Sequence, residues 1–230
     1  MMRVRATILT LALLIAGATN ADAQAVQDNF QVAATTGYQT YADNSGLKSG
    51  AWTVMGTATY YVANAIGVGV WTDLSFAEAD GSKFPVSAQS YIDSTTLNTL
   101  NQPLQIWNYG AHVKLQLPEA SLTPYALLGG GGYVMFLDAQ QQDELAKVTG
   151  GVVLLGLGAD WAVTETLGVE LFVADHFYPS WTPGNIYPAD EDFIDTQFPQ
   201  LSSGVIEDIN ESKSIHNFSV VLGVTVVPGR

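Results

Sequence analysis

Three residues near the end of one apolar segment have side chains that could hydrolyse an ester. His176 follows Asp175 directly and precedes Ser180 by four positions. A serine oxygen attacks an acyl carbon when a histidine removes its proton and a carboxylate orients the imidazole. The trio is therefore a candidate for catalysis. The alternative is that His176 is an ordinary residue at the rim of the fold.

A second set of titratable residues lies in segments that alternate between apolar and polar positions. Lys114, Asp160 and Glu170 each fall a few residues from a short connection, and His112 shares the polar face of Lys114. A charge held away from bulk water needs a partner of opposite sign and hydrogen bonds. We therefore predict that Lys114 pairs with Asp160 or Glu170 in a structural polar cluster that includes His112. Ion conduction is the alternative role.

Two further patterns match known sites poorly. The run Gly129–Gly132 is not followed by the Lys-Ser/Thr pair of a phosphate-binding loop. The three histidines of the sequence are scattered and form no recognisable metal-binding motif. We expect neither a cofactor nor a metal ion.

The stretch between Pro179 and Lys213 mixes aromatic and acidic side chains. Such a mixture offers apolar anchors and carboxylates to a partner molecule or to divalent cations. The candidate contact residues are Trp181, Tyr187, Asp190, Asp192 and Asp195. Because their spacing lacks the glycine and terminal glutamate of an EF-hand loop, a solvated acidic loop is the default interpretation.

The elements that carry these residues have a side-chain period of two. In 217–226, every second residue from Phe218 to Val226 is apolar, and 107–117 repeats the pattern. This alternation is typical of β-strands with one apolar face. Eight such segments are expected, at 30–41, 52–61, 66–76, 107–117, 122–137, 153–161, 167–174 and 217–226.

The connections between these segments alternate in length. Those near 63–65, 118–120 and 163–165 are short, whereas 79–103 and 179–213 are long. Short turns on one side and long loops on the other are typical of a transmembrane barrel, and closure leaves no strand edge exposed to lipid. We predict an all-β fold, an eight-stranded antiparallel up-and-down transmembrane β-barrel. A soluble lipocalin-like barrel is the alternative.

The N-terminal residues and the composition bear on destination and partners. Arg3 and Arg5 precede the apolar run Ala6–Gly17, and Ala21-Asp22-Ala23 forms a small-residue cleavage site. This layout predicts a signal peptide over 1–23 and a barrel over 24–230. The sequence has no cysteine, and its formal charge of -14 argues against nucleic acid as a partner.

The sequence resembles the small outer-membrane barrels typified by the transmembrane domain of outer membrane protein A and by the opacity-type proteins. The stretches Leu122–Phe136 and Gly150–Trp161 look like the Gly-rich hairpin strands of that family. The chain departs from the family at Val227–Arg230, which lacks the usual C-terminal aromatic residue.

We therefore expect a non-enzymatic barrel of the cell outer membrane in a Gram-negative-type envelope, with a closed or narrow lumen and a structural or surface-recognition role. Membrane lipid, lipopolysaccharide and an extracellular partner of the loops are the expected contacts. The alternatives are a small ion or solute channel, a lipid-modifying outer-membrane enzyme and a soluble periplasmic binder. The His-x-Ser arrangement of the lipid A deacylases is absent here, since Tyr178 occupies the second position after His176.

Overall fold

The computed structural model describes residues 28–83, 101–117, 122–137, 146–186 and 211–228. The predicted signal peptide lies outside these residues and stays a prediction. The eight strands are β1 (Phe30–Thr40), β2 (Gly50–Ala63), β3 (Ile66–Glu78), β4 (Pro103–Gln116), β5 (Leu122–Leu137), β6 (Ala146–Ala162), β7 (Leu167–Trp181) and β8 (Lys213–Val226). Three short 3₁₀ helices follow strand ends, namely η1 (Asp43–Ser45), η2 (Gly81–Lys83) and η3 (Pro183–Ile186).

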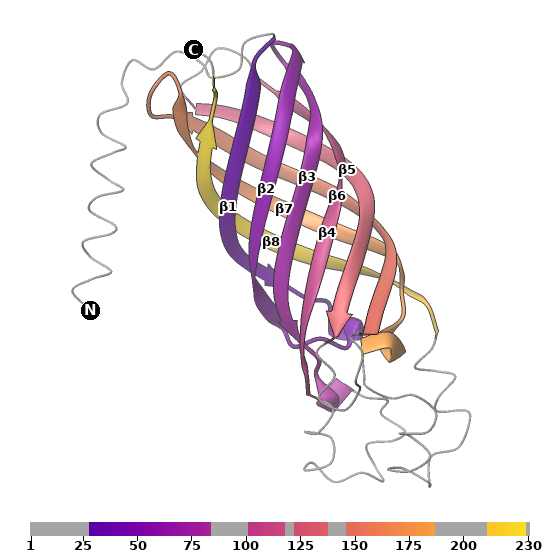
Figure 1. Ribbon diagram of the computed structural model, residues 1–230. Helices are drawn as coiled ribbons and strands as arrows, with labels where there is room; N and C mark the ends of the chain where they lie inside the picture. The colour runs from indigo at the N-terminus through magenta and orange to yellow at the C-terminus, as the bar shows by residue number, and fades with distance from the viewer. Residues whose placement is uncertain (1–27, 84–100, 118–121, 138–145, 187–210, 229–230) are drawn as a thin grey trace, which may run out of the picture.

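Each strand pairs with the next in antiparallel register, and β8 returns to β1 to close the barrel. The closing seam runs from Val32 opposite Val226 to Thr40 opposite Phe218. Figure 1 shows the tilted strands as one tube, with η1, η2 and η3 together at one end. The predicted fold class, an eight-stranded antiparallel up-and-down barrel, is confirmed.

Several strands are longer than the apolar alternation predicts. β4 begins at Pro103 rather than 107, β6 at Ala146 rather than 153, and β7 continues to Trp181 rather than ending at 174. The outer positions of these extensions hold polar or small residues such as Gln105 and Lys147. The hydrophobic signal therefore fades before the backbone ladder ends.

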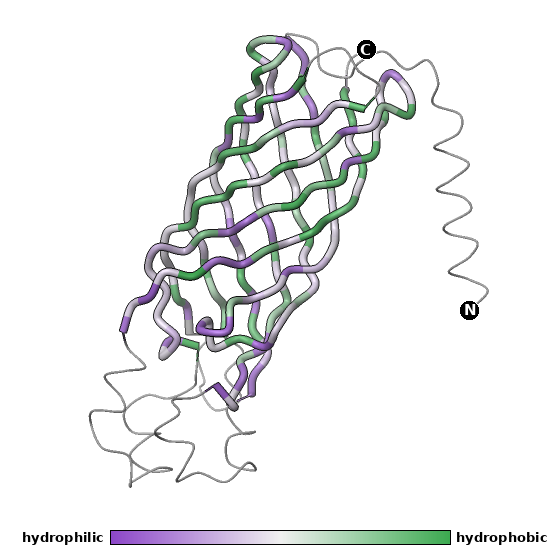
Figure 2. Tube along the Cα trace, turned by 180° about the vertical axis from the view of Figure 1, so that it is seen from behind, coloured by the Kyte–Doolittle hydropathy of each residue, from purple (hydrophilic) through white to green (hydrophobic). Residues whose placement is uncertain are grey.

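The outer surface of the barrel is apolar. Leu157 keeps 69% of its surface exposed, Trp52 64% and Val70 60%, and Figure 2 shows hydrophobic positions recurring along the wall. A soluble barrel places its apolar face inward, so the lipocalin-like alternative is wrong. Exposed aromatic residues mark the two ends of the wall, Phe30 and Tyr60 at the short-turn end, and Tyr38, Trp52, Phe76 and Trp107 toward the other. Such girdles lie at membrane–water interfaces.

The interior is filled with polar and aromatic side chains. Tyr61, Trp71 and Tyr178 are each no more than 2% exposed. Gly129 makes room for the Trp71 indole, because a Cβ atom built at Gly129 would lie 2.8 Å from Trp71 Nε1. An eight-stranded barrel has an interior that side chains can fill. No helix in the described residues is long and apolar enough to cross a membrane.

Candidate functional site

A buried ion-pair cluster, here called the lysine cluster, lies inside the short-turn half of the barrel. Lys114 Nζ is 2.6 Å from Asp160 Oδ2 and 3.7 Å from Glu170 Oε1. All three side chains are no more than 5% exposed. They come from β4, β6 and β7, and Asp160 is the register partner of Glu170. The strand alternation that turns apolar residues outward turns these three toward the axis.

Neutral groups complete the lysine cluster. Lys114 Nζ donates to Gln31 Oε1 at 3.1 Å, and the Tyr61 hydroxyl donates to the same oxygen at 2.7 Å. The Tyr125 hydroxyl donates to Glu170, and Lys114 Nζ lies 3.9 Å from the centre of the Tyr125 ring. A buried charge is tolerated when hydrogen bonds surround it. These contacts tie strands from opposite sides of the barrel together across its axis.

His112 lies apart from the carboxylates of the lysine cluster. Its Nε2 atom is 2.9 Å from Thr59 Oγ1, and its side chain is buried. The sequence pattern places it correctly on the inner face of β4, two positions from Lys114. Its described hydrogen bond, however, is to a neutral hydroxyl, so it is a neighbour of the cluster and makes no ion pair.

A second buried cluster, the histidine cluster, lies nearer the long connections and was not predicted. His176 Nε2 is 2.8 Å from Asp73 Oδ2, and the Asn108 side-chain amide donates to Asp73 Oδ1 at 2.9 Å. The Tyr178 hydroxyl donates to Asn108 Oδ1 at 3.1 Å. The available signal was Asp73 itself, the single acidic residue within 66–76. Its segment alternates less strictly, which hid its inward position.

The three candidate residues of a hydrolytic trio are divided between the two faces of the wall, so they do not come together. His176 points inward and contacts Asp73, whereas Asp175 points outward and its Oδ2 lies 2.7 Å from His216 Nδ1. Successive residues of a strand point to opposite faces, which keeps Asp175 from orienting His176. Ser180 is exposed near the end of β7.

Trp181 corrects another expectation, because it is not an exposed loop anchor. It ends β7, is 1% exposed, and its indole donates to the Ser45 carbonyl at 2.8 Å. A register shift between Tyr178 and Trp181 turns the indole inward. Tyr187, Asp190, Asp192 and Asp195 lie outside the described residues. Among the residues that are described, no cluster of three or more metal-binding side chains is present.

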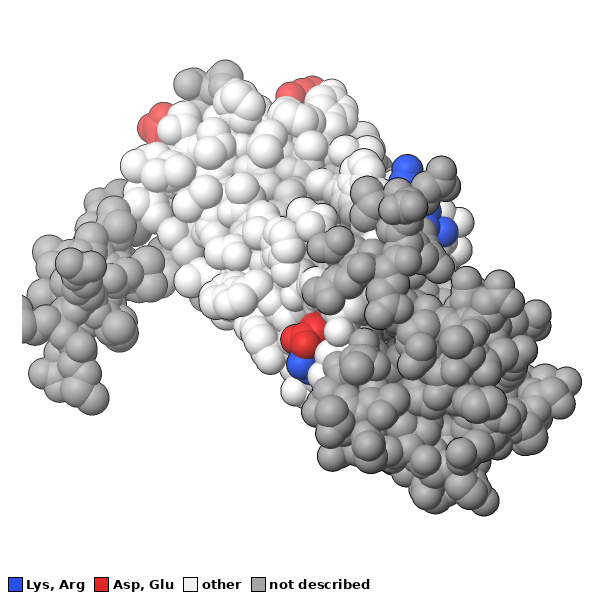
Figure 3. Space-filling view, turned by 60° about the horizontal axis from the view of Figure 1, so that its bottom comes forward, with Lys and Arg blue, Asp and Glu red and all other residues white. Residues whose placement is uncertain are grey.

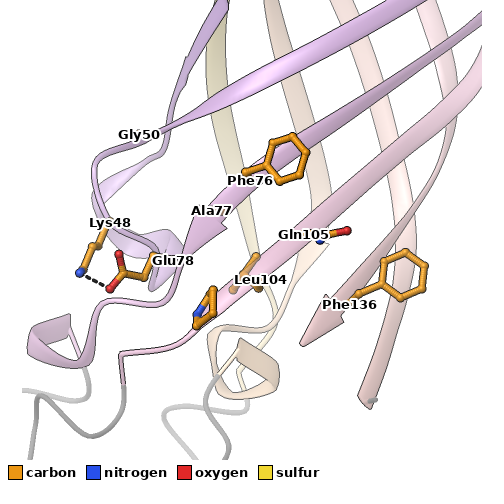
Figure 4. A pocket seen from close by; sticks show the side chains of 9 residues that line it. Lys48, Gly50, Phe76, Ala77, Glu78, Leu104, Gln105 and Phe136 are labelled. Atoms are coloured by element: carbon orange, nitrogen blue, oxygen red, sulfur yellow. Dashed lines mark hydrogen bonds and ion pairs between the residues drawn. The ribbon is translucent and has the colours of Figure 1, made fainter. Parts of the chain in front are cut away.

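The outer wall carries a groove near the long connections. Phe76, Gln105 and Phe136 are register partners in turn on β3, β4 and β5, and they line a space of about 730 Å³. Figure 4 shows the two phenyl rings on either side of Gln105, with the Lys48–Glu78 ion pair at the strand ends. The groove therefore combines an apolar floor with a charged border.

Charge on the outside is unevenly placed. The four exterior lysines of the described residues, Lys48, Lys83, Lys147 and Lys213, all lie at or beside the long-connection ends of strands. Figure 3 shows a largely uncharged wall with lysines beside the long-connection end. The ammonium of Lys147 lies 5.8 Å from the centre of the Phe136 ring. Cations therefore border the aromatic girdle at this end.

Comparison with known proteins gives the fold. No family model matches the sequence, and no curated protein matches it. Among solved structures, Neisserial surface protein A superposes with a TM-score of 0.55 and 13% identity, covering 90% of this chain and 99% of that one. The outer membrane protein OprG from Pseudomonas aeruginosa gives a TM-score of 0.50 and 11% identity, covering 90% and 99%. At these identities the likeness is one of fold. An outer-membrane barrel fold with an apolar wall places the protein in the cell outer membrane.

Proposed function

We propose that this protein is a closed barrel with a structural and surface-recognition role in the outer membrane. The observation that carries the proposal is a pair of hydrogen bonds across the barrel axis. The Lys114 ammonium donates one to Asp160 and the other to Gln31. An ion passing through the lumen would have to displace these partners in a space that side chains fill. In this proposal the lumen braces the wall and has no catalytic role.

Aromatic packing toward the long connections supports a closed lumen. The ring centres of Tyr133 and Tyr178 are 5.2 Å apart, and those of Tyr133 and Trp181 are 5.6 Å apart. These rings are buried together at the end of the barrel opposite the lysine cluster. A conducting channel, the main alternative, would require both layers to separate.

The proposed partners differ between the wall and the loops. The apolar wall suits lipid chains, and the exterior lysines suit the phosphates of lipopolysaccharide at the long-connection end. The groove between Phe76 and Phe136 gives an acyl chain a place against the wall beside these charges. Recognition of an extracellular partner would use the long loops, including Tyr187, Asp190, Asp192 and Asp195.

A planar-bilayer recording tests the closed lumen. The purified, refolded protein is expected to add no steady conductance. Lys114→Met is also expected to add no steady conductance, and at most brief openings, because the aromatic layer toward the long connections is still in place. A steady, ion-selective current from the unmodified protein would contradict the proposal. Faster gel migration of unboiled samples checks that the protein added to the bilayer is a folded barrel.

A further inference from the structure

A polar constellation lies on the lipid-facing side of the wall, where neighbouring residues are apolar. His216 Nδ1 on β8 is 2.7 Å from Asp175 Oδ2 on β7. The His216 side chain is 55% exposed and that of Asp175 19% exposed. Asp175 therefore binds the imidazole from a sheltered position while the rest of the ring stays accessible.

Ser214 adds a nucleophile to the same face. It precedes His216 by two positions on β8, so both side chains point outward, and both are exposed. Asp175 pairs in register with Phe218, the next outward residue beyond His216, so it approaches the ring from the side opposite Ser214. The carboxylate, the imidazole and the hydroxyl therefore follow one another along the wall in the order Asp175, His216, Ser214.

The backbone beside Ser214 is irregular. Tyr178 pairs with Ile215 and Trp181 with Lys213, so Pro179 and Ser180 together lie opposite Ser214. The Ser214 hydroxyl donates to the Pro179 carbonyl at 3.2 Å. Bulges of this kind redirect side chains and are common beside active sites. Catalytic hydrogen bonds are often long or poorly aligned in unliganded enzymes and tighten when substrate binds, so the contact of Ser214 with the Pro179 carbonyl is compatible with a catalytic role.

A purely structural role explains the pair poorly. The register partners of Asp175 are Leu155 on β6 and Phe218 on β8, both exposed apolar residues of the wall. A carboxylate among these residues loses part of its hydration, which costs free energy, whereas an apolar residue at the same position would carry no such cost. The buried histidine cluster already uses an Asp–His contact inside the barrel, so this one on the outside adds little to the core.

The constellation also lies at a suitable depth for a lipid ester. The Phe177 ring centre is 4.8 Å from that of His216, near the long-connection ends of β7 and β8. Aromatic girdles mark the level where headgroups meet acyl chains. Ester bonds of membrane lipids are found at that boundary, so a lipid could present its acyl carbonyl without leaving the bilayer.

We propose that Ser214 and His216 are catalytic residues of an esterase that removes ester-linked acyl chains from outer-leaflet lipids, and that Asp175 positions His216. The Ser214 oxygen attacks the acyl carbonyl, His216 accepts the hydroxyl proton and returns it to the departing alcohol. Water then attacks the acyl-enzyme, His216 takes its proton and returns it to Ser214, and a fatty acid leaves. This inference goes beyond the proposed scaffold role.

Covalent labelling tests the nucleophile. The purified barrel in detergent is treated with an alkyl fluorophosphonate, and the modified peptide is identified by mass spectrometry. We expect one adduct on Ser214, which is lost in Ser214→Ala and kept in Ser180→Ala, a matched exposed serine opposite it. An adduct on Ser180, or none in a barrel that migrates as folded, would overturn the proposal.

Activity measurements test the histidine, the aspartate and the substrate. Fatty-acid release is followed from phospholipid vesicles and, separately, from purified lipopolysaccharide. Either source supports the esterase and identifies its lipid, whereas release from neither, or equal release by Ser214→Ala, overturns it. We expect His216→Gln and Asp175→Asn to lower kcat by about 10²–10⁴-fold with little change in KM. Asp175→Glu should restore part of the rate if the carboxylate orients the ring. A closed lumen in the bilayer recording is independent of either outcome.

Discussion

Asp73 and His176 are 103 positions apart in the sequence, yet Asp73 Oδ2 and His176 Nε2 lie 2.8 Å apart inside the barrel. Asp73 also accepts a hydrogen bond from Asn108, so one carboxylate connects β3, β4 and β7. Both residues of the pair are buried. The contact therefore crosses the lumen and braces walls that share no backbone ladder.

Replacing Asp73 with alanine tests this brace. The substitution leaves His176 and Asn108 without their shared acceptor, and each unsatisfied buried group costs about 1–3 kcal/mol. We expect the free energy of unfolding, measured by urea titration in lipid vesicles, to fall accordingly. Asp28→Ala is the control, because Asp28 is exposed and accepts its hydrogen bond from Tyr60 at the rim. Equal losses in the two variants would show that the buried contact contributes nothing particular.

Lys114→Met tests the lysine cluster. Methionine fills similar space but leaves Asp160 and Glu170 without a cation, and breaking a buried ion pair costs about 3–5 kcal/mol. The unfolding temperature in detergent should fall clearly. Lys48→Met is the matched control, since its ion pair with Glu78 is roughly half exposed, with side chains 41% and 45% accessible. Exposed ion pairs contribute about 0–1 kcal/mol, so Lys48→Met should change the midpoint little. An unchanged midpoint for Lys114→Met would refute the buried pairing.

Two adjacent glycines allow a test of interior packing. Alanine at Gly129 would press on the Trp71 indole, whereas a Cβ atom at Gly130 meets nothing within 4 Å. Overpacking costs about 1–3 kcal/mol, so Gly129→Ala should destabilise the barrel and shift its tryptophan fluorescence. Gly130→Ala should be neutral or slightly stabilising, because alanine restricts the unfolded chain more than glycine does. Equal unfolding of the two variants would show that the Trp71 indole does not depend on the space left by Gly129.

An arginine placed on the wall tests its contact with lipid. Val70 is 60% exposed near the middle of β3, where a bilayer leaves a charge without water. Val70→Arg should lower the free energy of unfolding in vesicles by about 2–4 kcal/mol. Thr40→Arg places the same charge at the end of β1 and should cost about 0–1 kcal/mol. A wall that faced water would tolerate both changes equally.

Side-chain alternation was enough to predict the number and order of the strands, though not their full lengths, and the inward positions of Lys114, Asp160 and Glu170. It was enough because one face of each strand meets lipid and the other meets the lumen. The period of two therefore assigns each side chain to one of these two faces. Depth could also be estimated, since counting from the short turns puts these three residues at one level. The carboxylate oxygens of Asp160 and Glu170, which lie 2.6 and 3.7 Å from the Lys114 ammonium, are brought to it by barrel closure.

Two features could not be predicted from alternation alone. Trp181 turns inward because of the register shift after Tyr178. In such a bulge two residues of one strand lie opposite one residue of its neighbour, and the sequence of a single strand does not reveal this. Asp175 and His216 lie on neighbouring strands that are joined by a long connection, so the length of the connection does not determine how the two strands align. Predicting their contact requires the hydrogen-bond register of β7 and β8, which cannot be read from the sequence.

The seam between β1 and β8 has a consequence for assembly. Thr40 lies opposite Phe218, so the last pairing joins residues 178 positions apart through the hydrogen bond from Thr40 Oγ1 to the Phe218 carbonyl. Until β8 arrives, β1 presents an unpaired edge that hydrocarbon cannot satisfy. Insertion must therefore be concerted with closure, and an intermediate that lacks β8 would have to be sheltered by an assembly factor or remain outside the bilayer.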